Sequence, residues 1–327
     1  MVSSCSPTIT YSPAITLVPT HECFNRCSYC NFRVEPGQDD WLTVEAATEQ
    51  LRPFQPPAVI EVLLLSGEVH PAHPRRAAWF QRIYDLCERA IALGFLPHTN
   101  AGPLSYAEMA ALCRVNVSMG LMLEQVTPAL LNTVHRHAPS KQPDLRLQQL
   151  AWAGELRIPF TTGLLLGLGE TEGDRVDTLR AIAASHDQWG HIQEVIVQPH
   201  QPGTRQALTG PALAPEELIA CLRLARQHLP ADITLQVPPN LILTEATLMA
   251  AIAAGARDLG GISPVDVVNP DYPHPTIPAL KQRLAQHGYN LMPRLPVYAH
   301  YDAWLPQPLQ ALVATHRDRL RTRSPSR

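Results

Sequence analysis

The feature of this 327-residue chain that most constrains its fold is a strand–loop–helix pattern that repeats about eight times. The expected strands are short apolar runs with little alternation, which is typical of parallel strands buried on both faces. They cover residues 15–19, 59–65, 95–98, 115–119, 160–166, 194–198, 233–237 and 259–263. Strands and helices that alternate over such a length predict an α/β fold, a (β/α)8 TIM-type barrel, with residues 1–327 forming a single domain.

Several of the intervening helices are marked by residues that favour a helix start. Thr43 is a good N-cap, Ser105 and Glu108 can form a capping box, and Thr127 precedes a proline at the first helical position. Helices are expected to start near residues 43, 105 and 127 and to cover residues 75–93, 144–156, 174–185, 215–229, 247–254 and 277–287.

The two ends of the chain and its composition carry further expectations. Residues 294–298 are expected to cap one end of the barrel, and the basic tail at about 317–327 is expected to be disordered. A net charge of −3 without a basic stripe gives no support for nucleic-acid binding. No apolar run has the length of a membrane span, and residues 1–10 lack a signal-peptide pattern. We therefore expect a cytoplasmic protein whose thiols stay reduced.

Three cysteines fall within eight positions on the loop expected after the first strand, at about residues 21–33. Cys23, Cys27 and Cys30 could hold one corner of a four-iron cluster, because thiolates are soft ligands that suit iron. With no fourth cysteine nearby, one iron would stay open for a small molecule. Half a zinc site is the alternative, but the fourth ligand is missing at the usual spacing. Disulfides are disfavoured by the odd total of seven cysteines.

The CxxxCxxC spacing resembles the signature of the radical S-adenosylmethionine (SAM) enzymes, in which the open iron of a [4Fe–4S] cluster chelates SAM. The resemblance implies that residues 66–68 contact the methionine amino group and that the glycines of residues 163–167 lie along the adenine. It also implies an acid for the ribose hydroxyls and an aromatic residue beside the adenine. The SAM contacts implied in this way are Tyr29, Ser66, Gly67, Glu68, Glu124, Gly163 and Gly167. Taken alone, residues 66–68 would be an ordinary turn, and the glycine segment lacks the lysine of a phosphate loop.

Polar side chains follow several of the expected strands, where barrel enzymes place their active sites. Asn100, Gln198 and Asn269 are the candidate substrate contacts, and His98 and Thr99 precede the first of them. A lone polar residue at such a position is more often structural. Clustered around one mouth, these side chains suit a polyhydroxylated or heterocyclic substrate.

A narrower resemblance covers nearly the whole chain. It is carried by residues 9–12, 23–32, 96–100, 118–124, 158–163, 194–198, 237–241 and 260–264. In these stretches the chain is similar to the CofG-type subunit of FO synthase, whereas residues 199–204 and 265–270 depart from that family's pattern. FO is 7,8-didemethyl-8-hydroxy-5-deazariboflavin, the deazaflavin precursor of coenzyme F(420) and of some photolyase chromophores.

The resemblance implies a lyase that takes a hydrogen atom from a uracil–tyrosine adduct, closes the ring and releases ammonia. It also implies two partners: a companion CofH-type radical SAM subunit that makes the adduct, and a one-electron reductant such as a ferredoxin or flavodoxin. Two alternatives remain at this point. One is a different radical SAM enzyme, such as the companion subunit or a menaquinone-pathway relative. The other is a non-catalytic iron–sulfur or metal-binding protein.

Overall fold

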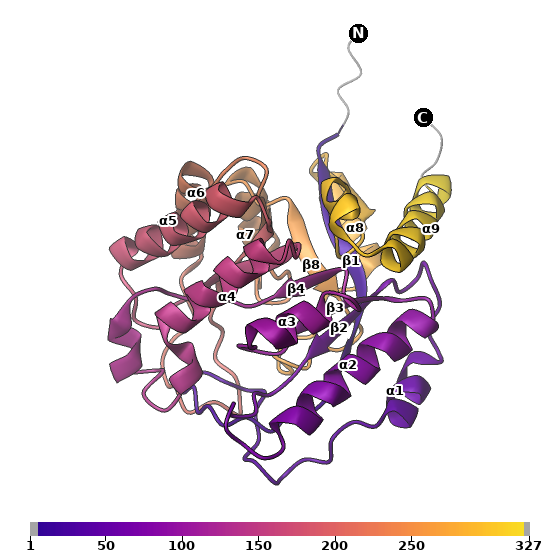
Figure 1. The fold of residues 1–327 in the computed structure, drawn as a ribbon. Coiled ribbons are helices and arrows are strands. Elements are labelled where there is room, and N and C mark those ends of the chain that lie inside the picture. The colour runs from indigo at the N-terminus through magenta and orange to yellow at the C-terminus, as the bar shows by residue number, and fades with distance from the viewer. Residues whose placement is uncertain (1–5, 324–327) are drawn as a thin grey trace.

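The computed structural model describes residues 6–323, and its eight strands β1–β8 close into a parallel barrel (Figure 1). A ninth strand, β9, pairs in parallel with the start of β1. The strands are β1 (Thr8–Leu17), β2 (Glu61–Leu65), β3 (Leu96–Asn100), β4 (Ser118–Gly120), β5 (Phe160–Leu166), β6 (Ile192–Pro199), β7 (Thr234–Gln236), β8 (Asp258–Ile262) and β9 (Asn290–Pro293). The predicted (β/α)8 barrel is therefore confirmed.

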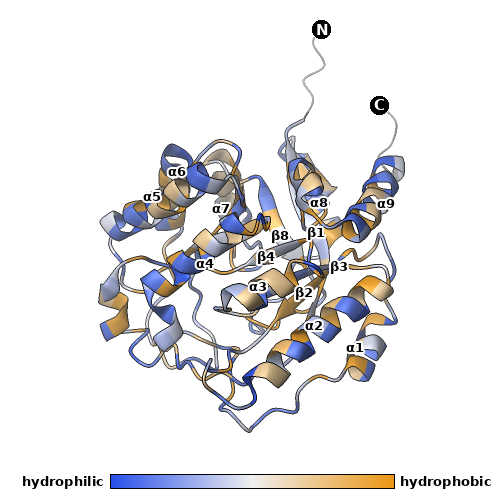
Figure 2. Cartoon of the chain, in the orientation of Figure 1, coloured by the Kyte–Doolittle hydropathy of each residue, from blue (hydrophilic) through white to orange (hydrophobic). Residues whose placement is uncertain are grey.

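Helices follow the strands and pack around the outside of the barrel (Figure 1). They are α1 (Val44–Leu51), α2 (Arg76–Ala92), α3 (Tyr106–Leu112), α4 (Pro143–Glu155), α5 (Glu172–Trp189), α6 (Pro215–His228), α7 (Glu245–Ala253), α8 (Ile277–Gln286) and α9 (Gln307–Arg323), with short 3-10 helices at Pro128–Asn132, Pro139–Lys141 and Ala299–Trp304. Thr43 caps α1, and Ser105 and Glu108 form the expected capping box of α3. Hydrophobic and hydrophilic residues alternate along α2 and α5, as expected for helices with one buried face (Figure 2).

Strand β1 is longer than the sequence predicts. It begins at Thr8 instead of residue 15, and successive parts of it pair with β9, β8 and β2. Its first half carries the polar residues Thr8, Thr10 and Ser12, so no apolar run marks it as a strand. The Thr10 hydroxyl instead donates a hydrogen bond to Asp258 on β8. By contrast, β5 has the predicted bounds, because it is buried throughout and ends in a run of leucines.

The segment after β9 closes the barrel at the end where the strands begin. Leu295 and Val297 pack in one apolar cluster with Ile60, Leu96 and Val117, which lie at or just before the starts of β2, β3 and β4. Tyr301 from the following 3-10 helix and Leu309 and Val313 from α9 extend this cluster. The expectation that residues 294–298 cap one end of the barrel is thus confirmed.

Two predictions about local structure are wrong. The tail expected to be disordered from about residue 317 is helical as far as Arg323, and residues 324–327 lie outside the described part of the chain. The helix is held because Arg317 pairs with Asp302 and the His316 ring lies 2.8 Å from the carbonyl oxygen of Gly94. The helix expected after Thr127 is only a 3-10 segment.

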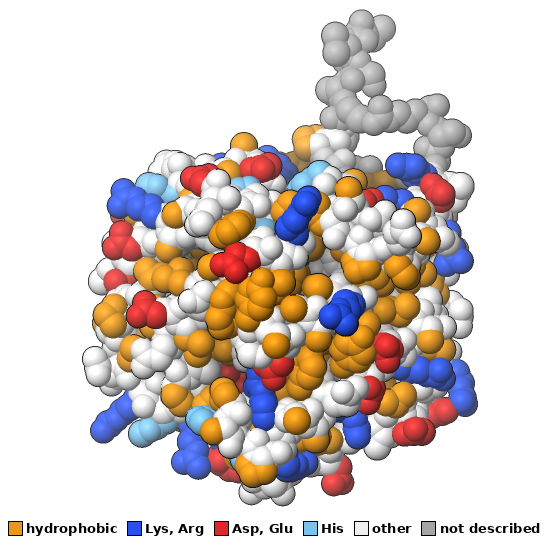
Figure 3. Space-filling model, in the orientation of Figure 1, with side chains coloured by type: hydrophobic (Ala, Val, Ile, Leu, Met, Phe, Trp, Pro, Cys, Tyr) orange, Lys and Arg blue, Asp and Glu red, His pale blue; other side chains and the backbone are white. Residues whose placement is uncertain are grey.

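The surface mixes charge signs. On the face in Figure 3, basic and acidic side chains alternate with apolar ones, and neither sign forms a continuous patch. None of the helices in the described part of the chain combines the length and the apolar character of a membrane span.

Candidate active site

The three cysteines lie on the loop that leaves β1. Cys23, Cys27 and Cys30 are free thiols and half-buried, and the Cys30 amide donates to the carbonyl of Cys27 at 3.2 Å. The base of the loop is closed by a short parallel bridge between Glu22 and Val34. The loop therefore presents three thiols at the carboxyl end of the barrel, where such folds place their active sites.

The segment after β2 supports this loop from behind. The Gly67 amide donates to the Thr20 carbonyl at 2.7 Å, and a Cβ at Gly67 would overlap the carbonyl oxygen of Glu22. The glycine thus permits close approach of two protein loops. The Ser66 side chain also points elsewhere, because its hydroxyl accepts from the Trp79 indole at 2.9 Å.

Glu68 is tied into the cysteine loop through both its backbone and its side chain. Its carbonyl accepts from the Phe24 amide at 3.0 Å, and its carboxylate accepts from the Asn25 side chain at 2.9 Å. The Arg146 guanidinium lies 3.7 Å from the same carboxylate. Asn25 also lies 3.7 Å from the Cys23 sulfur, so Glu68 is one side chain removed from a thiol.

Glu124 is the centre of a buried group of charges beside the cysteines. Its carboxylate accepts from Tyr29 Oη at 2.6 Å and from Lys141 Nζ, and His135 Nε2 lies 3.1 Å from both Tyr29 Oη and the carboxylate. Burial alone would raise the pKa of Glu124, but Lys141 and His135 outweigh it and hold that pKa well below its usual range. Arg146 acts in the same direction. Glu124 is therefore a fixed negative charge at neutral pH.

The glycines of β5 and the turn after it allow close backbone packing. A Cβ at Gly163 would overlap the carbonyl oxygen of Ile196 on β6, and the Gly163 carbonyl accepts from the Glu124 amide at 2.8 Å. Gly167 has a φ of +90°, which favours glycine. Its amide donates to the carboxylate of Glu170 at 2.9 Å, so Glu170 closes this turn. Between the glycines, Leu165 belongs to a small apolar cluster that Tyr29 contacts.

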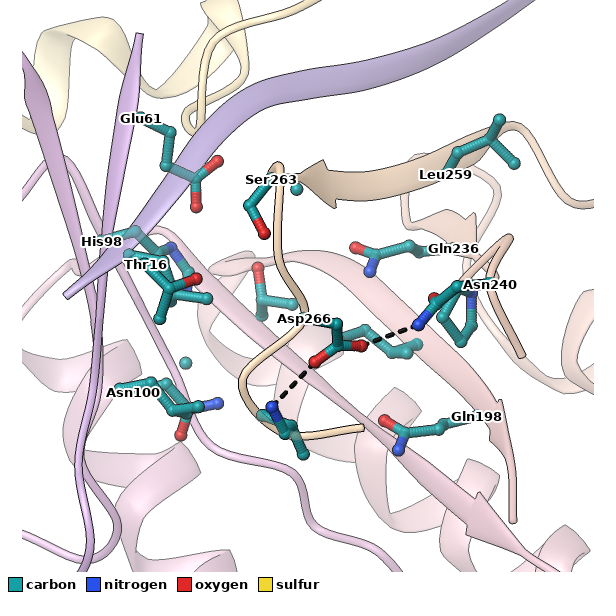
Figure 4. A pocket seen from close by; sticks show the side chains of 18 of the residues that line it. Thr16, Glu61, His98, Asn100, Gln198, Gln236, Asn240, Leu259, Ser263 and Asp266 are labelled. Carbon is teal, nitrogen blue, oxygen red and sulfur yellow. Dashed lines mark hydrogen bonds between the residues drawn. The ribbon is translucent and has the colours of Figure 1, made fainter. Parts of the chain in front are cut away.

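A cavity of about 190 Å³ occupies the barrel interior and opens at the mouth (Figure 4). Asn100, Gln198 and Asn269 all line it, so the structure brings the three predicted substrate contacts together. Asn100 and His98 lie across the pocket from Gln198. Asp266 fixes Asn269 by accepting from its backbone and side-chain amides at 2.9 and 3.2 Å.

The barrel cavity and a smaller pocket beside the cysteine loop share three residues, Gln198, Val268 and Asn269. The lining of the smaller pocket also contains Tyr29, Cys30 and Leu165. A small molecule beside the third cysteine would therefore lie next to a molecule in the barrel. Among the predicted site residues, Ser66 has its hydroxyl engaged by Trp79, and Glu68 lines other pockets beside Phe24.

A second group of polar side chains lies at the bottom of the same cavity, near the starts of the strands. Glu61 begins β2, and Glu194 lies near the start of β6. Arg294, from the segment after β9, donates hydrogen bonds to Glu194 at 2.5 Å and to Asp258 at 2.6 and 2.8 Å. Burial raises the pKa of Glu194 to about 8, against the effect of Arg294. His98 lies above them with a pKa that burial lowers to about 3.

The sequence interpretation missed the residues that gather around Glu124. Lys141, His135 and Arg146 come from the segment between β4 and α4 and from α4 itself. The position of Arg146 could have been noticed. It lies on the same face of α4 as Gln149, Leu150 and Ala153, and that face is buried. A charged side chain on a buried face requires a partner of opposite charge. Nothing comparable marks Lys141 or His135 in the sequence.

The donor set fits an iron–sulfur cluster better than a single metal ion. Within residues 6–323, no three His, Cys, Asp or Glu side chains converge to hold one ion. Three cysteines of a cluster bind three different irons and need not converge on one point. Burial raises the pKa of Cys27 to about 12 while Lys141 lowers it, so ligation must displace thiol protons.

A (β/α)8 barrel with three cysteines on the loop after β1 defines a class of protein, and the family comparison gives the same class. The model of the radical SAM superfamily matches residues 17–182. Two solved structures share the fold: the FeFe-hydrogenase maturase HydG from Carboxydothermus hydrogenoformans and methylornithine synthase (PylB). Their TM-scores are 0.70 and 0.68 at 16% and 18% identity, covering 96% and 91% of this chain and 77% and 86% of those chains.

Curated relatives are far more similar. A protein of Synechococcus elongatus is 62% identical over 98% of this chain and 96% of its own length. Relatives from Trichormus variabilis and Gloeobacter violaceus are 61% and 58% identical, over 94% and 96% of this chain and 91% and 97% of their own lengths. All three are named 7,8-didemethyl-8-hydroxy-5-deazariboflavin synthase.

The chain therefore belongs to the radical SAM superfamily and, within it, to the 7,8-didemethyl-8-hydroxy-5-deazariboflavin synthase family. It is a radical SAM enzyme, and its cofactors are a [4Fe–4S] cluster and SAM. The other radical SAM activities and the non-catalytic alternative are not favoured.

Proposed function

We propose that this enzyme forms FO from 5-amino-5-(4-hydroxybenzyl)-6-(D-ribitylimino)-5,6-dihydrouracil, with loss of ammonia from carbon, as a carbon–nitrogen lyase. The observation that carries the proposal is the shared wall between the cysteine-loop pocket and the barrel cavity. Gln198 and Asn269 line both, so a radical source held by the loop would open directly onto a substrate in the barrel. The family of the chain supplies the identity of the product.

In this proposal Cys23, Cys27 and Cys30 ligate the cluster. When bound, the cluster and SAM would supply the radical chemistry needed for hydrogen-atom abstraction from the adduct. The half-buried loop and the apolar wall formed by Tyr29 and Leu165 exclude water from the reacting atoms.

The residues around the cysteines are assigned to SAM by charge and position. Glu124 is an ionised acceptor that suits ribose hydroxyls, and Lys141 beside it is a cation that suits a carboxylate. Glu68 and the backbone at Gly67 lie against the loop, where an acceptor suits the methionine amino group. Gly163 and Gly167 shape the strand and turn that the adenine would follow, and Ser66 contributes through its backbone because its hydroxyl is engaged by Trp79.

The substrate is assigned to the barrel cavity. Asn100, Gln198 and Asn269 offer amide donors and acceptors at the mouth, and these match the imide edge of a uracil ring. The loops that depart from the family pattern lie beside them. Thr204 donates to Asp271 at 2.7 Å, and Tyr272 donates to the Pro202 carbonyl at 2.7 Å, so the two loops form one rim.

The partners in this proposal are a companion CofH-type subunit that supplies the adduct and a ferredoxin or flavodoxin that supplies electrons. We place the protein in the cytoplasm, where the thiols that bind the cluster stay reduced.

Feeding experiments on the purified chain separate this function from that of the companion subunit. The reconstituted enzyme with SAM and reductant should form FO from the finished adduct and nothing from tyrosine plus ribitylamino-uracil. Cys27→Ala should lose both the cluster absorbance and FO formation. If the chain alone builds the hydroxybenzyl adduct from tyrosine, the subunit assignment is wrong.

A further inference from the structure

The barrel cavity extends from the mouth toward the starts of the strands. Glu194, Ile196 and Gln198 all line it from β6, so the cavity follows this strand from its start to its end. Gln198 is four positions after Glu194, about 13 Å along a strand at roughly 3.3 Å per residue. Of these three residues of β6, only Gln198 also lines the smaller pocket beside the cysteine loop. The floor is therefore well removed from the source of the radical.

Small residues keep the lower part of the cavity open. Barrel interiors are usually filled by large branched side chains, but Gly120 and Gly261 line this one. A Cβ at Gly120 would lie 2.9 Å from His98 Nε2, and a Cβ at Gly261 would lie 3.8 Å from both carboxylate oxygens of Glu61. The two glycines thus leave room around His98 and Glu61.

Glu61 is a buried acid without a counter-ion of its own. It is 6% exposed and, among the described residues, forms no salt bridge. The nearby Arg294 is already engaged by Glu194 and Asp258. A carboxyl group in such a place is costly unless it receives hydrogen bonds. The Ser12 side chain supplies one to Glu61, and donors from a ligand would supply the others. Burial raises the pKa of Glu61, as expected for this environment.

His98 faces the same part of the cavity as Glu61. Its Nδ1 lies 2.7 Å from the Ser118 hydroxyl, and the Nε2 edge borders the open space at Gly120. Figure 4 shows the Glu61 carboxylate and the His98 ring extending from neighbouring strands into the pocket, with Thr16 and Ser263 nearby. The floor therefore offers an acid, a neutral imidazole and hydroxyl groups within one small space.

Resting on the proposed function, we propose that Glu61 and His98 bind the hydroxyl groups of the ribityl chain of the substrate. Ring closure and ammonia loss involve the hydroxybenzyl and uracil parts, which must lie at the mouth near the cysteine loop. The polyol chain is the part left to reach the floor. Carboxyl oxygens and an imidazole nitrogen suit hydroxyl groups, whereas the amides at the mouth match the flat imide edge.

The first test compares two substrates in two enzymes. Glu61→Gln keeps the size of the side chain and weakens its power to accept hydrogen bonds. With the natural adduct, KM should rise about tenfold to a hundredfold while kcat changes less than threefold, the effect of losing about two hydrogen bonds to the ligand. With an adduct that carries methyl in place of ribityl, the variant and the wild type should have equal KM. Glu88→Gln, an exposed exchange on α2, is the control.

A second readout does not require turnover. Binding of FO to the holoenzyme without reductant is followed by the fluorescence of FO, alongside a deazaflavin with methyl in place of ribityl. Glu61→Gln should weaken binding of FO and leave the methyl compound unaffected. Equal weakening of both compounds would overturn the inference. It would instead indicate that Glu61 contacts the uracil ring.

The outcomes for the two proposals are distinct. A wild-type enzyme that neither forms nor binds FO contradicts the proposed function, whatever Glu61 does. A wild type that forms FO, with a variant that handles both substrates like the wild type, contradicts only the ribityl site. If Glu61→Gln does not fold, His98→Asn is compared in the same way and carries the same expectation.

Discussion

Glu124 shows how one residue can organise the surroundings of the cysteine loop. Its φ of +64° is rare for a residue other than glycine, and the strained backbone lets its amide reach the Gly163 carbonyl. The same conformation places its carboxylate between Tyr29 and Lys141. Backbone strain at an active site of this kind persists only where surrounding contacts hold it.

Removing the charge of Glu124 should destabilise the protein. Glu124→Gln leaves Lys141 buried without its counter-ion, which typically costs about 3 kcal/mol. Urea denaturation at pH 7 measures this, with the exposed exchange Glu88→Gln as a control that should change the unfolding free energy by less than about 0.5 kcal/mol. A loss as small as that of the control would contradict the buried ion pair.

Buried histidines should make the protein sensitive to acid. Burial lowers the pKa of His191 to about 3, against about 6.5 in the unfolded chain. The unfolded state therefore binds the extra proton first, and stability is lost as pH falls from about 6.5 toward 3. His191→Leu should reduce the loss of unfolding free energy between pH 8 and pH 5 by about 2 kcal/mol. Denaturation at both pH values checks this, and an unchanged loss would count against it.

At the residue scale, the sequence pointed to some site residues and not to others. The cysteines, Glu124 and the glycines belong to spaced motifs, and the structure places them around one mouth. Lys141 and His135 belong to no motif and meet Glu124 only because the segment between β4 and α4 folds back over the barrel. The Ser66 position was recognisable, but its hydrogen bond with Trp79 depends on packing against α2.

Among the elements, the cysteine loop depends on the turn after β2. Gly67→Ala would push a Cβ into the carbonyl of Glu22 at the base of the loop. We expect an unfolding free energy lower by at least about 2 kcal/mol and markedly less iron bound after reconstitution. Gly173→Ala on α5 is the matched control, since its Cβ would meet nothing closer than 3.6 Å. Normal iron content in Gly67→Ala would show that the turn does not brace the loop.

The elements themselves were predictable where local chemistry decides them. β5 combines β-branched threonines with a run of leucines, and Ser105 with Glu108 fixes the start of α3, so both follow from the sequence. The first half of β1 is a strand because β8 and β9 pair with it, and its polar residues give no local sign of this. The Thr127 cap has the right chemistry, but the chain after it forms only one short 3-10 segment.

At the scale of the whole molecule, Arg294 joins the C-terminal segment to two barrel strands. Arg294→Met leaves Glu194 and Asp258 buried without their cation, so the unfolding free energy should fall by about 3–5 kcal/mol. The loss should grow from pH 6 to pH 9, because the uncompensated carboxyl groups can be protonated only at the lower pH. Arg321→Met, at an exposed position of α9, is the control for denaturation at both pH values. A loss independent of pH would contradict this assignment.

The most direct test of the proposed reaction follows the nitrogen that leaves. The adduct is labelled with ¹⁵N at its amino group and given anaerobically to the reconstituted enzyme with SAM and a strong reductant. We expect FO, labelled ammonia and 5′-deoxyadenosine in equal amounts, and none of them from Cys27→Ala. Formation of 5′-deoxyadenosine from the wild type without FO or labelled ammonia would contradict the proposed reaction.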